Sequence, residues 1–151
     1  AQYFRLASLV HDSWTTAMVT QIKRHKIFRW HDAGDVQSND HMSKILEVVR
    51  QTPNTNHWLP TQERPYLPAP ERVPSNLVIR LSGSKVDGPA PTAWSHTSSV
   101  IIKSFFWKVQ LWINKIFKIT GKCFAPIQGG KCKECRQCWT KSIKNVSYGK
   151  H

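Results

Sequence analysis

The stretch KIFRWHDAGDVQSNDHMSKILEVVRQTPNTNHWLPT, residues 26–61, decides the fold class. It begins with a short apolar run that ends in an Asp/Gly turn, which is typical of a buried strand that leads into a loop. Its middle part starts with capping residues (38–40), carries apolar side chains at helical spacing and stops at Pro53. NTNHWLPT, residues 54–61, then has the pattern of a second short strand. The stretch therefore predicts a strand, a helix and a strand in that order.

The sequence on either side extends this pattern. Residues 3–25 place apolar side chains at roughly helical spacing and predict one or two helices. A proline-rich stretch after residue 62 predicts a loop, and NLVIRLSGS, residues 76–84, is the clearest strand. Strands that alternate with helices are typical of a parallel sheet, but 151 residues fall short of the ~250 of a closed eight-stranded barrel. We predict an α/β fold with a partial (β/α) barrel-like parallel sheet.

Polar residues follow the first predicted strand at its carboxyl end, which is where parallel sheets bind ligands. His31, Asp32 and Asp35 are therefore candidate catalytic or cofactor-binding residues, able to bind a cation or share acid/base work. The structural alternative is that Asp35 caps the following helix and Asp32 pairs with Arg29 or Arg80. The residues expected at the same edge after the later strands are Thr61, Glu63, Ser82 and Ser84.

The chain has four cysteines, all within KCFAPIQGGKCKECRQCW, residues 122–139. Their spacing is C-x8-C-x2-C-x2-C, formed by Cys123, Cys132, Cys135 and Cys138. Thiolates two residues apart can reach one ion from a tight turn, so the segment predicts a metal site. The C-x2-C-x2-C run is similar to one that wraps a [4Fe–4S] cluster, with Cys123 as the fourth ligand. Zinc, which usually takes two C-x2-C knuckles, is the alternative.

The charge of the chain predicts a polyanionic partner. Twenty-two Lys and Arg residues against nine Asp and Glu give a formal charge of +13, and Glu134 is the only acid after Lys103. Such an excess suits a nucleic acid, a nucleotide or an acidic membrane surface, and the plain alternative is that it only keeps the protein soluble. The residues predicted to bind a polyanion are Lys131, Lys133, Arg136, Lys141 and Lys144.

Residues 100–122, VIIKSFFWKVQLWINKIFKITGK, predict a basic amphipathic helix. One reading is an ordinary helix whose apolar arc faces the core, and the other is a helix that lies on a membrane surface or a partner. No apolar run is long enough to predict a transmembrane span, and the start of the chain does not resemble a signal peptide, so we predict no secretion. The first residue is not Met, which suggests part of a longer protein. The apolar arc comprises Ile101, Phe105, Val109, Trp112, Ile113 and Ile116.

Four segments, RLASL, FRWHDAGDVQSNDHMSKILEVVRQTPNTNHWLPTQE, NLVIRLSGSKVDGPAP and CFAPIQGGKCKECRQCWTKSIKNVSYGKH, resemble the phage-encoded Gene product 88 domain family. The resemblance implies a protein of phage or prophage origin in the cytoplasm of the infected bacterial host. It also suggests kinship with radical-SAM-like partial barrels. The family typically carries further cysteines upstream of its RLASL segment, and its connection before the cysteines is much shorter. The resemblance thus divides the chain into an α/β region (1–99), an insertion (100–122) and a cysteine-rich segment (123–151).

The cysteines and the resemblance together predict a phage-type protein that binds an iron–sulfur cluster, with redox or radical-SAM-like chemistry when the upstream segment is present. One alternative is a zinc-stapled basic module that binds nucleic acid. Another is a structural or host-interaction protein. The sequence leaves open whether the protein is an enzyme, because fold-level kinship does not assign a reaction.

Overall fold

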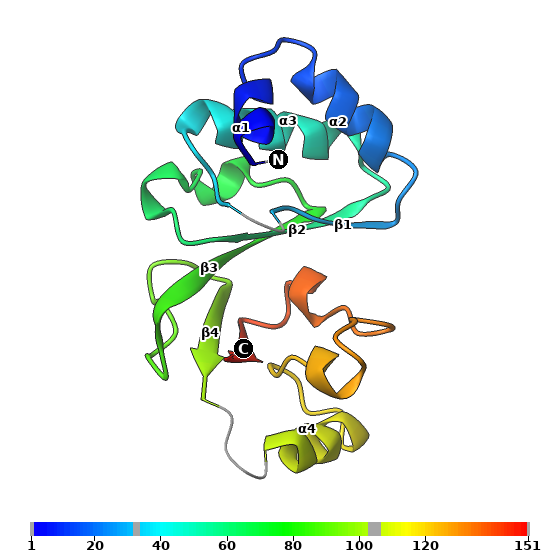
Figure 1. Cartoon of the computed structure of the whole chain (residues 1–151), viewed down its shortest axis with the longest axis vertical. Helices are drawn as coiled ribbons and strands as arrows, with labels where there is room; N and C mark the ends of the chain where they lie inside the picture. Colours follow the sequence, from blue (N-terminus) through cyan, green and yellow to red (C-terminus); the bar gives the residue numbers. More distant parts are fainter. Residues whose placement is uncertain (1, 32–33, 103–106, 151) are drawn as a thin grey trace. The chain divides into compact units, whose positions relative to one another are not determined.

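The computed structural model describes residues 2–31, 34–102 and 107–150. The chain forms two compact units, Ala1–Val78 and Ile79–His151, and the boundary falls inside strand β3, Leu77–Val86 (Figure 1). The strands are hydrogen-bonded in the order β1-β2-β3-β4-β5, which is also their order along the chain. Strand pairs β1–β2, β3–β4 and β4–β5 are parallel. A parallel sheet whose neighbours are also neighbours in sequence has the topology of part of a (β/α) barrel, so the predicted fold class is confirmed.

In its described residues the first unit contains three α-helices and two complete strands. Figure 1 shows the three helices gathered on one side of the two strands. Strands β1 and β2 pair in parallel from Ile27 with Asn56 to Arg29 with Trp58. Two helices within residues 3–25 and the strand, helix, strand order after them are as the sequence predicts. The elements are α1 (Gln2–Ser8), α2 (Trp14–Ile22), β1 (Ile27–Arg29), α3 (Asn39–Gln51), β2 (Asn56–Thr61) and the 3-10 helices η1 (Arg64–Tyr66) and η2 (Pro70–Arg72).

Helix α3 holds the core of the first unit together. It begins after Ser38, whose hydroxyl oxygen accepts a hydrogen bond from the backbone N–H of His41 at 3.1 Å and so satisfies a donor at the helix start. The side chain of Asn76 donates to the carbonyls of Val49, Thr52 and Thr55 at 3.0–3.1 Å, which fastens the helix end to the start of β3. The apolar side chains that α3 buries are Met42, Ile45, Leu46, Val48 and Val49.

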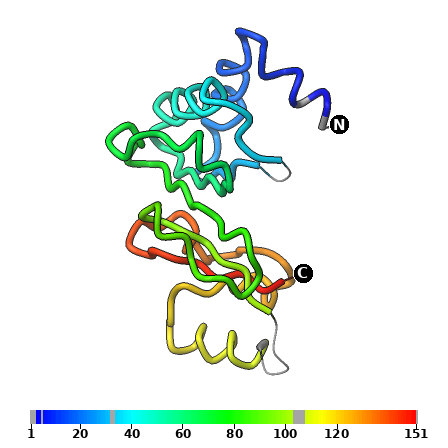
Figure 2. The backbone as a smooth tube through the Cα atoms, turned by 90° about the vertical axis from the view of Figure 1, so that its left-hand side faces the viewer, coloured from blue at the N-terminus to red at the C-terminus, as the bar shows by residue number. Residues whose placement is uncertain are grey.

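The second unit contains the rest of β3, then β4 (Thr97–Ile101), α4 (Trp107–Ile116), the 3-10 helices η3 (Ala125–Ile127) and η4 (Gln137–Trp139), and β5 (Asn145–Gly149). Strands β4 and β5 pair along their whole length, whereas β3 and β4 shift register between Ser82 and Val86. Figures 1 and 2 both place α4 beside the cysteine-bearing segment between α4 and β5.

Helix α4 differs from the helix that the sequence predicts. Its described residues are Trp107–Ile116, whereas Val100 and Ile101 of the predicted helix belong to β4. The predicted arc residue Phe105 lies outside the described residues. The reading in which the apolar arc faces the core is wrong, since Val109, Trp112, Ile113 and Ile116 are 38–61% exposed. The buried side of the helix instead carries Leu111 and Asn114. In the described part of the chain no helix is long and apolar enough to span a bilayer.

Candidate functional site

Arg80 organises the cysteine segment of the second unit. It lies on β3, its side chain is completely buried, and its guanidinium donates hydrogen bonds of 2.9–3.3 Å to six backbone carbonyls. Five of these acceptors lie within residues 137–144, directly before β5, so one side chain fastens that stretch to the sheet. Burial lowers the pKa of Arg80, whereas the charges of Cys138 and Tyr148 raise it. The acceptors are the carbonyls of Gln137, Cys138, Thr140, Ile143, Lys144 and Thr97.

Three of the four cysteines lie in the same neighbourhood. Cys138 is buried, and its sulfur is 3.0 Å from the hydroxyl oxygen of Tyr148 on β5. The pKa of the Cys138 thiol is raised to about 12, mainly by burial. The hydrogen bond with Tyr148 and the charge of Arg80 lower this pKa, and the charges of Cys123 and Cys132 raise it. Burial likewise raises the pKa of Tyr148, and the charges of Cys138 and Cys123 add to the effect. Cys123 and Cys132 are therefore near enough to influence the ionisation of Cys138.

Cys135 takes a different position from these three thiols. Its backbone N–H donates to the carbonyl of Cys132 at 2.8 Å, which closes the C-x2-C turn, and Lys133 in that turn has a left-handed φ of 44°. The Cys135 side chain packs instead against a small core formed by Leu111 and Phe124. Among the described residues no three His, Cys, Asp or Glu side chains are grouped so that they could hold one metal ion. Three of the four predicted ligands thus lie near one another, and Cys135 lies apart from them.

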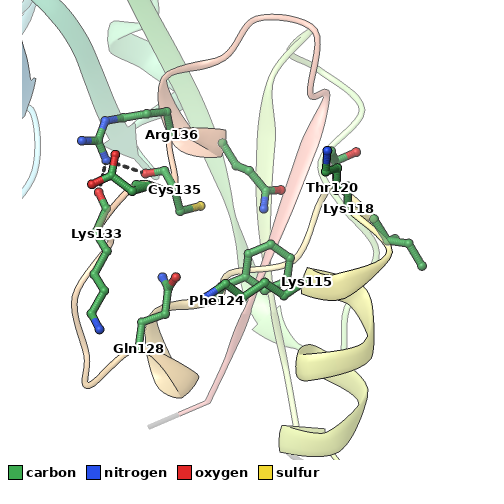
Figure 3. Close-up of a pocket in the computed structure, with 11 residues that line it drawn as sticks. Lys115, Lys118, Thr120, Phe124, Gln128, Lys133, Cys135 and Arg136 are labelled. Carbon is green, nitrogen blue, oxygen red and sulfur yellow. Dashed lines mark hydrogen bonds between the residues drawn. The ribbon is translucent and has the colours of Figure 1, made fainter.

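A pocket of about 450 Å³ is lined in part by residues 133–137 of the cysteine segment. Figure 3 shows the thiol of Cys135 pointing into the space that Phe124 and Gln128 border. Four cationic side chains line this pocket, against the single acid Glu134. The cationic residues are Lys115, Lys118, Lys133 and Arg136.

The predicted polyanion-binding residues lie on the surface of the second unit, and two of them, Lys133 and Arg136, line this pocket. The Arg136 guanidinium donates to the carbonyl of Cys135 at 2.9 Å and also to that of Lys133, so its position is held by the turn itself. The exposed cations are Lys131, Lys133, Arg136, Lys141 and Lys144.

At the strand ends of the first unit, Asp35 is a structural link. One carboxylate oxygen accepts from the N–H of Val36 at 2.7 Å and from the hydroxyl of Thr61 at 2.6 Å, and the other accepts from the N–H of Gln62 at 2.7 Å. Asp35 thus joins the loop after β1 to the end of β2, a proximity that the parallel order of the two strands predicts. The expectation that Asp35 caps α3 is wrong, because Ser38 is the cap. Asp32 lies outside the described residues.

His31, the third predicted residue of this group, lies after β1 with a left-handed φ of 54°. Burial lowers its pKa, and the nearby charge of Asp35 acts in the opposite direction. Its ring centroid is 5.5 Å from that of His41 on α3, whose pKa burial lowers to about 4. The structure therefore brings His31 and Asp35 into one neighbourhood. A catalytic role for them stays a prediction.

Two residues beside Cys138 have no predicted role in a site. Sequence patterns indicate Arg80 only as an ion-pair partner of Asp32, and they assign nothing to Tyr148. The sequence contains a signal for Arg80, since it is a charged residue between the apolar residues Ile79 and Leu81 of the run LVIRL. A charge in a strand that is otherwise buried needs partners, and its partners had to come from elsewhere in the chain.

The fold and this site define an α/β protein with a parallel, barrel-type sheet and a cysteine-rich segment held on that sheet by a buried arginine. A family model described as Gene product 88 matches residues 1–141. The chain therefore belongs to the Gene product 88 family, the phage family that its sequence motifs resemble. No curated protein and no solved structure matches the chain.

Proposed function

We propose that the second unit is a metal-binding domain whose ligands are Cys123, Cys132, Cys135 and Cys138. The observation that carries the proposal is the environment of Cys138: a buried guanidinium lies beside it, and the charges of two further thiols reach it. All described hydrogen bonds of Arg80 go to neutral carbonyls, so its positive charge is not balanced by a carboxylate among them. A metal–thiolate centre carries negative charge and would balance it.

Cys135 would have to leave its apolar contacts with Leu111 and Phe124 to complete the ligand set. The loop before it is suited to such a change. Gly129 and Gly130 both have left-handed φ values, 70° and 76°, which glycine adopts at no steric cost. The C-x2-C turn already presents Cys132 and Cys135 from one tight backbone segment, as thiolate ligands require.

We favour an iron–sulfur cluster over zinc, because the C-x2-C-x2-C spacing suits it better. When bound, a cluster would supply one-electron transfer, whereas zinc would supply a structural cross-link. In either case the residues of this chain have defined tasks. Arg80 holds the backbone around Cys138, and the hydroxyl of Tyr148, 3.0 Å from the Cys138 sulfur, would donate a hydrogen bond to that sulfur once it is a metal-bound thiolate.

The test is anaerobic purification of the full chain, followed by metal and sulfide analysis and a visible spectrum. We expect a brown protein with iron and acid-labile sulfide, and loss of both in the variants Cys132→Ser and Cys138→Ser. Ser142→Ala is the matched control, because this exposed residue lies in the same segment and should leave the metal content unchanged. A colourless protein with one zinc per chain would overturn the iron–sulfur assignment and keep the metal site. A protein without metal would overturn both.

A second candidate function is binding of single-stranded nucleic acid or a nucleotide to the basic surface around the pocket. The observation that favours it is that four cationic side chains and the nearly buried ring of Phe124 line the same pocket. Cations that neutralise phosphates release counterions, so affinity should fall steeply with salt. Replacing Lys133 or Arg136 by Gln should reduce the salt slope by about one each. Absence of oligonucleotide and nucleotide binding at low salt would contradict this function.

A further inference from the structure

Helix α4 presents a continuous apolar surface to solvent. Residues 109, 112, 113 and 116 follow the i, i+3, i+4, i+7 spacing of one helix face, and their side chains are 57%, 61%, 38% and 55% exposed. Phe117, directly after the helix, extends this surface and is 72% exposed. We call these residues the α4 stripe: Val109, Trp112, Ile113, Ile116 and Phe117.

The opposite side of α4 is the side that packs within the second unit. Leu111 is buried with Phe124, and Ile101 and Ile127 pack against this pair. Asn114, one turn along the same side, is also buried. At 3.6 residues per turn, this side and the α4 stripe face in opposite directions. The stripe could not turn into the unit's own core without exposing Leu111.

The charges near the α4 stripe indicate what would cover it. Lys108 and Lys115 lie on α4 beside the stripe, Lys118 follows the helix, and all three are exposed. The sequence from Lys103 to Lys133 contains no Asp or Glu. An apolar stripe with Trp and Phe, flanked by lysines and free of acids, matches an anionic lipid surface, which offers acyl chains for the stripe and headgroups for the lysines. A nucleic acid offers phosphates but no apolar layer for five large side chains.

We propose that the α4 stripe binds the surface of anionic membranes. The helix lies in the plane of the interface, with Trp112, Ile116 and Phe117 in the headgroup and acyl boundary, about 5–10 Å deep. Lys108, Lys115 and Lys118 contact the anionic headgroups. No residue of the α4 stripe is a cysteine ligand or lines the pocket beside Cys135, so the inference does not rest on the proposed metal centre.

The test is co-sedimentation of the full chain with vesicles of phosphatidylcholine and phosphatidylglycerol, compared with vesicles of phosphatidylcholine alone. We expect binding to the anionic vesicles and weak binding to the neutral ones. Trp112→Ser should weaken binding about tenfold or more, because a large apolar side chain no longer enters the interface. Lys108→Gln and Lys115→Gln should each weaken it about fivefold.

Two controls separate this effect from general changes. Val86→Ser removes an apolar residue that is 40% exposed on β3, and Lys150→Gln removes an exposed charge outside the helix, so neither should alter vesicle binding. Circular dichroism should be the same for all variants, since the altered side chains are exposed. The proposal would be overturned if the chain did not bind anionic vesicles, or if Trp112→Ser bound them as well as the parent protein. It would also be overturned if the chain self-associated, Trp112→Ser made it monomeric, and neither form bound vesicles.

Discussion

Replacement of Arg80 by methionine should strongly destabilise the second unit. The substitution removes every hydrogen bond from this side chain to the segment 137–144 while keeping an unbranched apolar stem. The carbonyls of Gln137, Thr140 and Lys144 would each keep a backbone N–H donor. Those of Cys138 and Ile143 have Arg80 as their donor among the described hydrogen bonds.

The size of the effect follows from these two carbonyls. A buried acceptor left without a donor costs about 1–3 kcal/mol, and a hydrogen bond from a charged donor contributes about 1.5–3 kcal/mol. Methionine also removes the cost of burying a charge, which offsets part of the loss. We therefore expect the free energy of unfolding of the second unit to fall by about 3–5 kcal/mol. Arg80→Lys should lie between methionine and arginine, because the ammonium group keeps the charge but has three donors.

Hydrogen exchange followed by mass spectrometry is the suitable assay, because it reports the stability of each segment of the chain separately. Peptides that cover residues 137–148 should exchange much faster in Arg80→Met, and urea unfolding should shift to lower concentration. Arg72→Met is the matched control, since Arg72 is exposed and its loss should change stability by no more than about 0.5 kcal/mol. If Arg80→Met exchanges like the parent protein in this segment, or Arg80→Lys is fully equivalent to arginine, the assigned role of Arg80 is wrong.

Three further predictions concern the first unit. Burial lowers the pKa of His57 from 6.5 to about 4. Between these pH values the unfolded state therefore binds more protons than the folded state. The contribution of His57 to stability should be complete above pH 6.5, and the free energy of unfolding should fall by up to about 3 kcal/mol towards pH 4. His57→Gln should flatten this dependence in urea unfolding measured across pH, and an unchanged slope would refute the assignment. Asp35→Asn should cost about 1–3 kcal/mol by weakening the link between β1 and β2, whereas the exposed control Asp40→Asn should cost little; equal losses would contradict the structural role. Ser38→Ala should cost about 1 kcal/mol through loss of the α3 cap, measured by thermal unfolding, and a neutral result would show that another group satisfies that helix start.

Local patterns predicted the central strand, helix and strand well. Ser38 caps α3, and the helix ends just before Pro53, because capping and proline chemistry act within a few residues of where they stand. The parallel order of β1 and β2 was also predictable, since parallel neighbours need a crossover connection that is usually a helix, and the predicted helix between these strands supplies it. The contact between Asp35 and Thr61 at the strand ends followed from that order.

Two features could not be predicted in this way. The carboxylate of Asp35 is occupied by Val36, Thr61 and Gln62, and a D-x-x-D pattern does not distinguish such a link from a ligand site. The apolar arc of α4 predicts an amphipathic helix, but periodicity does not say which side a helix turns to its own core. Leu111 decided this, because its contact with Phe124 fixes the rotation of the helix.

Sequence patterns were enough to predict the strand, helix and strand of residues 26–61, their order, and four cysteines at a spacing suited to one metal site. These features depend on interactions between residues close together in the chain. The tertiary structure alone decided what surrounds Cys138 and which face of α4 meets solvent. Arg80 lies 58 positions before Cys138 and holds its carbonyl at 2.9 Å. A buried charge requires partners, but which carbonyls supply them depends on how β3 and the cysteine segment are brought together by folding.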